Sequence, residues 1–114
     1  MRKKINIVCL SLLVAFTSCK NEHHTPDNLI DTATLTSIIT EVFLIDGYDY
    51  IVSSRYRDSL GYQPNAAKEA LFQKYHISQA DYDSSMYYYA LHQKTFEEMM
   101  QRAINNLEKR KTEN

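Results

Sequence analysis

The residues with the types needed for hydrolytic chemistry lie in the second half of the chain: Ser85, Asp81 and two histidines, His76 and His92. A serine activated by a histidine and an acid is the set that nucleophilic hydrolysis uses. No nucleophile elbow or glycine-rich turn presents this serine, and such residues are scattered through any helical protein. The sequence therefore favours a protein without this activity.

Carboxylate pairs and metal ligands are the other candidates. Asp81 and Asp83 point to different faces of a helix, and the adjacent pair at 97–98 opens a helix, so neither forms an acid–base pair. His23 and His24 are neighbours, but no Cys, Asp or Glu cluster completes a tetrahedral site around them, and solvated histidines are the commoner reading. With no phosphate-binding or cofactor motif present, we expect neither an enzyme nor a metal or cofactor.

The first element that the sequence predicts is a long helix beginning after Asp31, a suitable N-cap. Its apolar positions recur at helical spacing. They are Leu35, Ile38, Ile39, Val42, Phe43 and Ile45. Gly47 interrupts this pattern, and the sequence leaves open whether residues 46–60 extend the helix or form a loop.

A short second helix follows a loop marked by Gly61 and Pro64, with Asn65 as its expected N-cap and Tyr75 near its end. The stretch Ser78-Gln79-Ala80-Asp81 has the form of a capping box and predicts a third helix starting there. Residues Tyr82, Met86 and Tyr89 make its apolar stripe, Ser85, Tyr88 and His92 lie beside that stripe, and Tyr87 faces outward.

The last predicted helix starts with a second capping box, Thr95-Phe96-Glu97-Glu98. Its stripe comprises Phe96, Met99, Met100, Ala103, Ile104 and Leu107, and residues 109–111 are basic, which suits the negative end of a helix dipole better than it indicates a membrane contact. No segment alternates as a strand would, and the chain has only 2 glycines. We predict an all-α fold, a small bundle of about four helices.

The N-terminus has the features of an export signal. Three basic residues precede an apolar run from Ile5 to Phe16, which is too short for the roughly 20 residues that span a bilayer. The sequence Phe16-Thr17-Ser18-Cys19 resembles a lipobox with a relaxed first position. That resemblance implies cleavage before Cys19 and attachment of acyl chains such as palmitate to it; an ordinary secretory signal is the alternative. Cys9 leaves with the signal, so no intramolecular disulfide is possible.

Four segments follow from this: a lipoprotein signal peptide (1–18), a lipidated cysteine with a short flexible tether (19–30), a helical domain (31–110) and a C-terminal tail (111–114). Removing residues 1–18 takes away three of the 13 basic residues and none of the 14 acidic ones, which leaves a formal net charge of −4. An acidic mature chain without a basic surface is not expected to bind nucleic acid.

The pattern Tyr75-His76-Ile77-Ser78, Asp81-Tyr82, Ser85 and Tyr88-Tyr89 resembles that of the DUF4296 family of small lipoproteins from Bacteroidetes, over about residues 26–107. The family implies no established activity. A Pro break that often follows the tyrosine pair is missing in residues 90–94, so the third and fourth helices should be less sharply separated. The resemblance implies an outer-membrane location, and the single Glu22 after the cysteine favours the periplasmic face over the cell surface.

Tyrosines carry the remaining functional expectation, since the chain has 9 of them and no tryptophan. Tyr75, Tyr82 and Tyr89 are expected in the core with their hydroxyls at its rim. Tyr48, Tyr50, Tyr56 and Tyr62 crowd one segment, which either folds over the bundle or presents a patch to a protein partner. Tyr87 and Tyr88 are further candidates for partner binding. We therefore expect a module that binds an envelope protein or, alternatively, one that binds a glycan or other small ligand.

Overall fold

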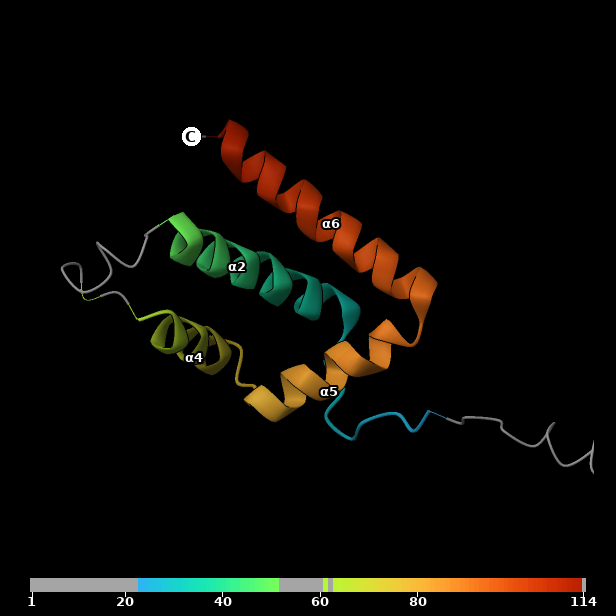
Figure 1. Cartoon of the computed structure of the whole chain (residues 1–114). Coiled ribbons are helices and arrows are strands. Elements are labelled where there is room, and N and C mark those ends of the chain that lie inside the picture. The colour runs from blue at the N-terminus through green and yellow to red at the C-terminus, as the bar shows by residue number, and fades with distance from the viewer. Residues whose placement is uncertain (1–22, 52–60, 62, 114) are drawn as a thin grey trace, which may run out of the picture.

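The structure of the chain, a computed structural model, describes residues 23–51, 61 and 63–113, and these residues form helices without any strand. The helices are α2 (Thr32–Ile51), α4 (Pro64–Lys74), α5 (Gln79–Ala90) and α6 (Gln93–Thr112). Helix α2 lies in the middle, between α6 and α4, and α5 runs back beside α6 (Figure 1). This arrangement confirms the predicted all-α bundle of about four helices.

The core is built around the N-terminal half of α2. Leu35, Ile38 and Ile39 are almost completely buried there, and Met99 and Ala103 of α6 meet them. Helix α4 contributes Leu71 and Phe72 to the same cluster. Most residues of the predicted apolar stripes therefore do enter the core.

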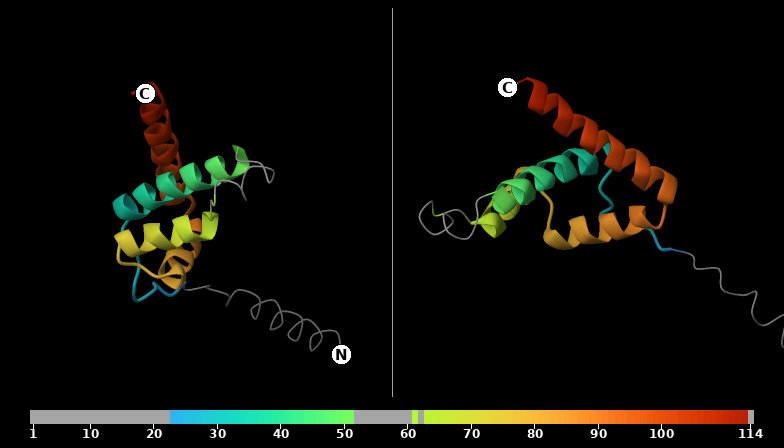
Figure 2. Two further views of the ribbon diagram at one scale, coloured as in Figure 1. Left: turned by 90° about the vertical axis from the view of Figure 1, so that its left-hand side faces the viewer. Right: turned by 45° about the horizontal axis from the view of Figure 1, so that its top comes forward.

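Two stripe residues were predicted wrongly, because Phe43 is 39% exposed and Ile104 is 44% exposed. Helices α2 and α6 diverge toward their C-terminal ends (Figure 2). The C-terminal halves of α2 and α6 therefore do not cover each other's apolar stripes, as helices packed side by side along their whole length would. Phe43 and Ile104 are exposed to solvent for this reason.

Burial on more than one side of α2 explains its two buried threonines. Thr36 and Thr40 are 4% and 1% exposed. Each hydroxyl donates a hydrogen bond to the carbonyl oxygen four residues earlier, over 2.6 Å to Thr32 and 2.8 Å to Thr36. Their polar groups are therefore satisfied inside the helix, as burial demands.

The segment before α2 is held by α5 through a pair of buried hydrogen bonds to one residue, Ile30. The backbone N–H of Ile30 donates to Ser85 Oγ over 3.0 Å, and the Tyr89 hydroxyl donates to the Ile30 carbonyl oxygen over 2.9 Å. Ser85 is fully buried and Ile30 is only 7% exposed. Ile30, which the sequence analysis placed in the tether, thus belongs to the packed core, and the Tyr89 hydroxyl points inward and not to the rim.

The helix caps follow the sequence in two cases. Asp31 Oδ2 accepts from the Thr34 N–H over 2.9 Å, and this bond holds the pKa of the Asp31 carboxyl below its usual range. Ser78 and Asp81 exchange both hydrogen bonds of a capping box, at 2.9 Å and 3.0 Å, which lowers the pKa of Asp81 in the same way. Both predicted N-caps are confirmed.

The other two predicted helix starts are wrong. Helix α4 begins at Pro64 and not after Asn65, because proline suits the first helical position, where no N–H is needed. Helix α6 begins at Gln93, so Thr95 lies inside it and makes no cap. Only two residues separate α5 from α6, which agrees with the missing proline break.

Replacing Ser85 by Ala tests the hydrogen bond that the Ile30 N–H donates to Ser85 Oγ. The substitution leaves a buried backbone N–H without its acceptor, which should lower the free energy of unfolding by about 1–3 kcal/mol. Urea unfolding measures the loss. The matched control is Ser84→Ala, because Ser84 is only half-buried and bonds within its own helix; it should change stability by less than about 0.5 kcal/mol. Equal effects of the two substitutions would contradict a stabilising role of the hydrogen bond between Ile30 and Ser85.

Candidate interaction surfaces

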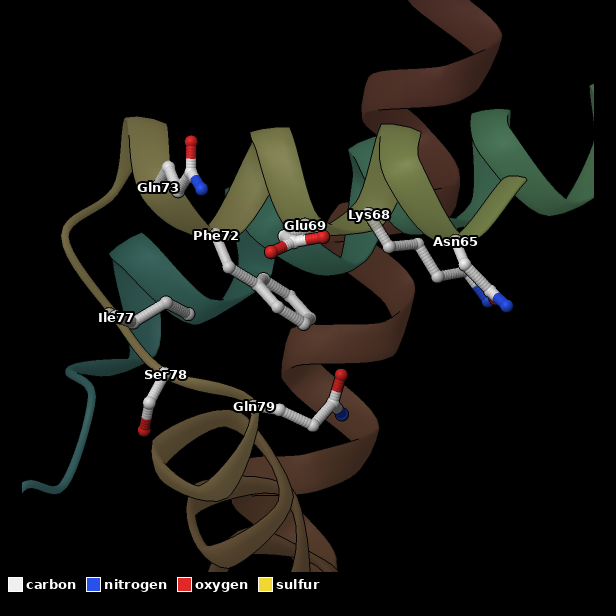
Figure 3. A pocket seen from close by; sticks show the side chains of 8 residues that line it. All are labelled: Asn65, Lys68, Glu69, Phe72, Gln73, Ile77, Ser78 and Gln79. Carbon is white, nitrogen blue, oxygen red and sulfur yellow. The ribbon is translucent and has the colours of Figure 1, made fainter. Parts of the chain in front are cut away.

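A groove of about 470 Å³ lies between α4 and the start of α5 (Figure 3). The Phe72 ring points into it, and Ile77 lies beside that ring. The remaining lining residues are polar or charged: Asn65, Lys68, Glu69, Gln73, Ser78 and Gln79. The groove thus has a small apolar base and a polar rim, with one aromatic ring and no tyrosine among its lining residues.

The groove owes its shape to the way in which α4 ends. His76 has a positive φ of 54°, its N–H donates to the Gln73 carbonyl oxygen over 3.1 Å, and the Ile77 N–H donates to that of Phe72 over 3.0 Å. This pair of bonds is the Schellman motif, which brings the residue after the left-handed one back toward the last turn. Ile77 therefore reaches Phe72, and the predicted helix end near Tyr75 is confirmed.

A second hollow, which we call the tether hollow, lies where the N-terminal segment crosses α5. Its volume is about 300 Å³. It is lined by His23, His24, Pro26, Ser84, Tyr87, Tyr88 and Leu91. Tyr87 and Tyr88 are the two tyrosines that helical spacing placed outside the apolar stripe of α5. Nothing in the sequence indicates that residues 23–26 lie beside them.

Tyr88 is fixed by ring contacts at the end of α5. Its ring meets Tyr89 edge-on with centroids 5.3 Å apart, and the His92 ring lies 4.3 Å away. The Nδ1 of His92 also bonds to the Tyr88 carbonyl oxygen over 2.7 Å. Tyr88 is therefore half-buried and held in place, whereas Tyr87 beside it is 67% exposed, as its predicted outward position requires.

Among the residues that the structure describes, the end of α2 carries the largest group of exposed apolar side chains. We call it the α2-end surface, and its members are Phe43, Leu44, Tyr48, Tyr50 and Ile51. Tyr50 and Ile51 are 89% and 78% exposed. Tyr56 and Tyr62 lie outside the described residues. The C-terminal end of α2, which carries the α2-end surface, lies at the opposite end of the molecule from the C-terminal half of α5, which lines the tether hollow (Figure 1). The structure therefore does not bring the candidate tyrosines that it describes into one patch.

Charged groups near these surfaces serve to join α4 to α2. Glu41 accepts from Lys74 Nζ over 3.2 Å and from the Tyr75 hydroxyl over 3.1 Å, and Lys68 pairs with Asp46 over 2.7 Å. Burial, followed by the bond to Glu41, raises the pKa of Tyr75. Burial also raises the pKa of Tyr82 and Tyr89, which fits their expected places at the core.

Residues considered for catalysis are engaged in building the fold. Ser85 Oγ is buried against Ile30, Asp81 caps α5 and His76 closes α4. Within residues 23–51, 61 and 63–113, no three side chains of His, Cys, Asp or Glu come together as a metal site. Among the helices that the structure describes, none is long and apolar enough to cross a bilayer.

Comparison with known proteins gives a family. The model of the domain of unknown function DUF4296 matches residues 26–113, which is most of the chain, and the chain belongs to that family. The match includes the segment from Pro26 to Ile30 that α5 holds. No curated protein and no solved structure matches the chain.

Replacing His76 by Gly tests the Schellman motif that shapes the groove. A side chain at a positive φ costs roughly 1 kcal/mol, and glycine avoids this cost. His76→Gly should therefore raise the free energy of unfolding by about 1 kcal/mol, as measured by urea unfolding. His76→Ala is the control, because alanine keeps a Cβ and should give no gain. A loss of stability in the glycine variant would contradict the motif.

Proposed function

We propose that this protein is a lipid-anchored protein of the bacterial envelope that binds another envelope protein and catalyses no reaction. The observation that carries the proposal is the α2-end surface, where five large apolar side chains are exposed within nine residues. Patches of this kind usually mark a site of interaction. The chain belongs to the DUF4296 family, and its lipobox-like sequence at residues 16–19 supports a lipoprotein.

The anchor that we propose is Cys19. A basic and apolar leader ends in Phe16-Thr17-Ser18-Cys19, which resembles a lipobox. Acyl chains contribute about 0.8 kcal/mol for each buried CH₂ group, and more than one chain gives stable attachment. We place the protein on the periplasmic face of the outer membrane. A lipoprotein exported to the cell surface would carry a denser acidic run after the cysteine, whereas Glu22 is the one acidic residue in the stretch from Lys20 to Pro26.

The α2-end surface suits protein binding by its composition. Leu44, Tyr48 and Ile51 follow one another at i, i+4 and i+7 and so lie along one face of α2. Tyrosine rings supply a large contact area with few rotatable bonds, and they recur at the centres of protein interfaces. The surface is therefore better suited to a protein partner than to solvent alone.

The absence of catalysis is also part of the proposal. Three facts support it. The Ser85 hydroxyl is buried, the Asp81 carboxylate accepts a hydrogen bond in the cap of α5, and His76 is the left-handed residue that ends α4. Each of these three groups has a structural task that accounts for it. The described surfaces thus offer contact area, without a reactive centre assembled from these residues.

The alternative function is binding of a glycan or another small ligand. The observation that favours it is the tether hollow, where the Tyr87 and Tyr88 rings lie beside the polar side chains of Ser84 and two histidines. A sugar ring stacks on exposed tyrosines, and polar groups beside the rings fix its orientation. Binding of a glycan panel to the purified domain, lost in Tyr87→Ala, would favour this alternative.

Substituting the α2-end surface tests protein binding. Tyr48→Ala with Tyr50→Ala should abolish recovery of a stoichiometric partner from solubilised envelope membranes, because losing a central tyrosine weakens binding by roughly 30-fold or more. Tyr87→Ala is the matched control, an exposed tyrosine at the other end of the molecule, and it should keep the partner. Unchanged recovery with the double variant would exclude this surface.

Replacing Cys19 by Ser tests the anchor. Without the thiol no acyl chain can be attached, so the protein should leave the membrane fraction and lose labelling by a fatty-acid probe. Intact-mass analysis of the wild-type protein should show the added lipid. Membrane attachment that persists in Cys19→Ser would mean that the anchor lies elsewhere.

A further inference from the structure

We infer that the end of the molecule at the tether hollow rests on the lipid bilayer, with Tyr87 and Leu91 in the headgroup layer. This inference rests on the proposed anchor at Cys19 and adds an orientation to it. The surface concerned consists of Tyr87 of α5, Leu91 at the C-cap of that helix, and the two histidines of the N-terminal segment that line the same hollow.

The path of the chain places this surface close to the anchor. The N-terminal segment lies beside α5 from His23 onward, since the exposed His23 and His24 and the half-buried Pro26 line a hollow with α5, and Ile30 is held by two hydrogen bonds. Only four residue steps separate Cys19 from His23. Even fully extended, they span at most about 14 Å. The lipid is therefore attached within about 14 Å of the tether hollow, on the same side of the molecule.

The side chains at this end are of the kind that bilayer interfaces favour. Tyr87 is 67% exposed and Leu91 is 39% exposed, and their i, i+4 spacing puts them on one face of α5. Tyrosine has an apolar ring and a polar hydroxyl, and it is enriched where hydrocarbon meets the headgroups. Two such side chains bind a membrane only weakly by themselves. Their role here is to orient a protein that its acyl chains already anchor to the membrane.

The charges at this end also suit a bilayer. The exposed Asp83 lies one turn before Tyr87. Beyond it, no Asp or Glu occurs before Glu97, and Lys94 is the one charged residue in that interval. In residues 23–30 the only carboxylate is Asp27. A surface with few carboxylates avoids repulsion by anionic lipids, whereas the mature chain as a whole is acidic.

The opposite orientation is not compatible with a short tether. The basic residues Lys109, Arg110 and Lys111 are at the far end of α6, a helix of 20 residues that is about 30 Å long. That end and the N-terminal segment lie on opposite sides of the molecule (Figure 1). With the tether hollow on the bilayer, the α2-end surface points away from the membrane, where a protein partner can reach it.

Single-cysteine labelling of the lipidated protein tests this orientation. Cys19 is the only cysteine of the mature chain and is blocked by lipid, so a new cysteine is the only free thiol. Tyr87→Cys and Leu91→Cys report on the proposed contact; Tyr50→Cys and Glu69→Cys, both at exposed positions of other helices, are the matched controls. Each variant carries the fluorophore NBD and is reconstituted into vesicles of phosphatidylethanolamine and phosphatidylglycerol.

On vesicles, the emission of the labels at 87 and 91 should shift to the blue, and quenching by acrylamide should fall several-fold relative to the same labels in the Cys19→Ser protein. Labels at 50 and 69 should not change. Because these vesicles hold neither sugar nor another protein, the protection can come only from lipid. Circular dichroism of each variant confirms that the helices are kept.

The inference is overturned if the protein floats with the vesicles while the labels at 87 and 91 stay as accessible as those at 50 and 69. Protection at 50 or 69 instead would show another orientation and overturn it equally. In the first of these outcomes the protein still floats with the vesicles, so the proposed lipid anchor at Cys19 would stand although the orientation would not. A protein that does not float overturns the anchor, and the orientation with it.

Discussion

The backbone of Ile30 is the point on which the architecture depends. Its N–H and its carbonyl oxygen are both bound by side chains of α5, from Ser85 and Tyr89, across 55 and 59 residues of sequence. Asp31 caps α2 directly afterwards. The start of the central helix is thus fixed to α5, and the two-residue link after α5 fixes α6 in turn. Without these bonds, a buried peptide group would lie unpaired in the core.

The same constraint gives the molecule two different ends. Because the N-terminal segment crosses α5, the tether hollow forms at the end where the chain enters the fold. Helix α2 runs away from that point and exposes its apolar C-terminal residues at the other end (Figure 1). The proposed membrane contact and the proposed protein contact can therefore coexist on one small domain, separated by the length of its central helix.

Local signals in the sequence predicted most of the helices, and non-local contacts account for what they missed. The capping box at Ser78 and the outward position of Tyr87 depend only on residues that are close in the sequence. Both could therefore be predicted from the sequence alone. The task of Ser85 depends on a backbone group 55 residues away, which no pattern reveals. Thr95 has the form of a cap, but α5 ends at Ala90 and α6 already begins at Gln93, so Thr95 lies inside α6. The tether hollow, likewise, needs segments that are distant in sequence.

Native-state hydrogen exchange at the Ile30 amide tests this account most directly. Since this N–H is buried and bonded to Ser85, it should exchange as slowly as the amides of core residues such as Ile39, through global unfolding. The amides of His24 and Thr25, a few residues earlier, should exchange much faster. If the Ile30 amide exchanged as fast as those two, the segment would not be held by α5, and the account of the fold would be contradicted.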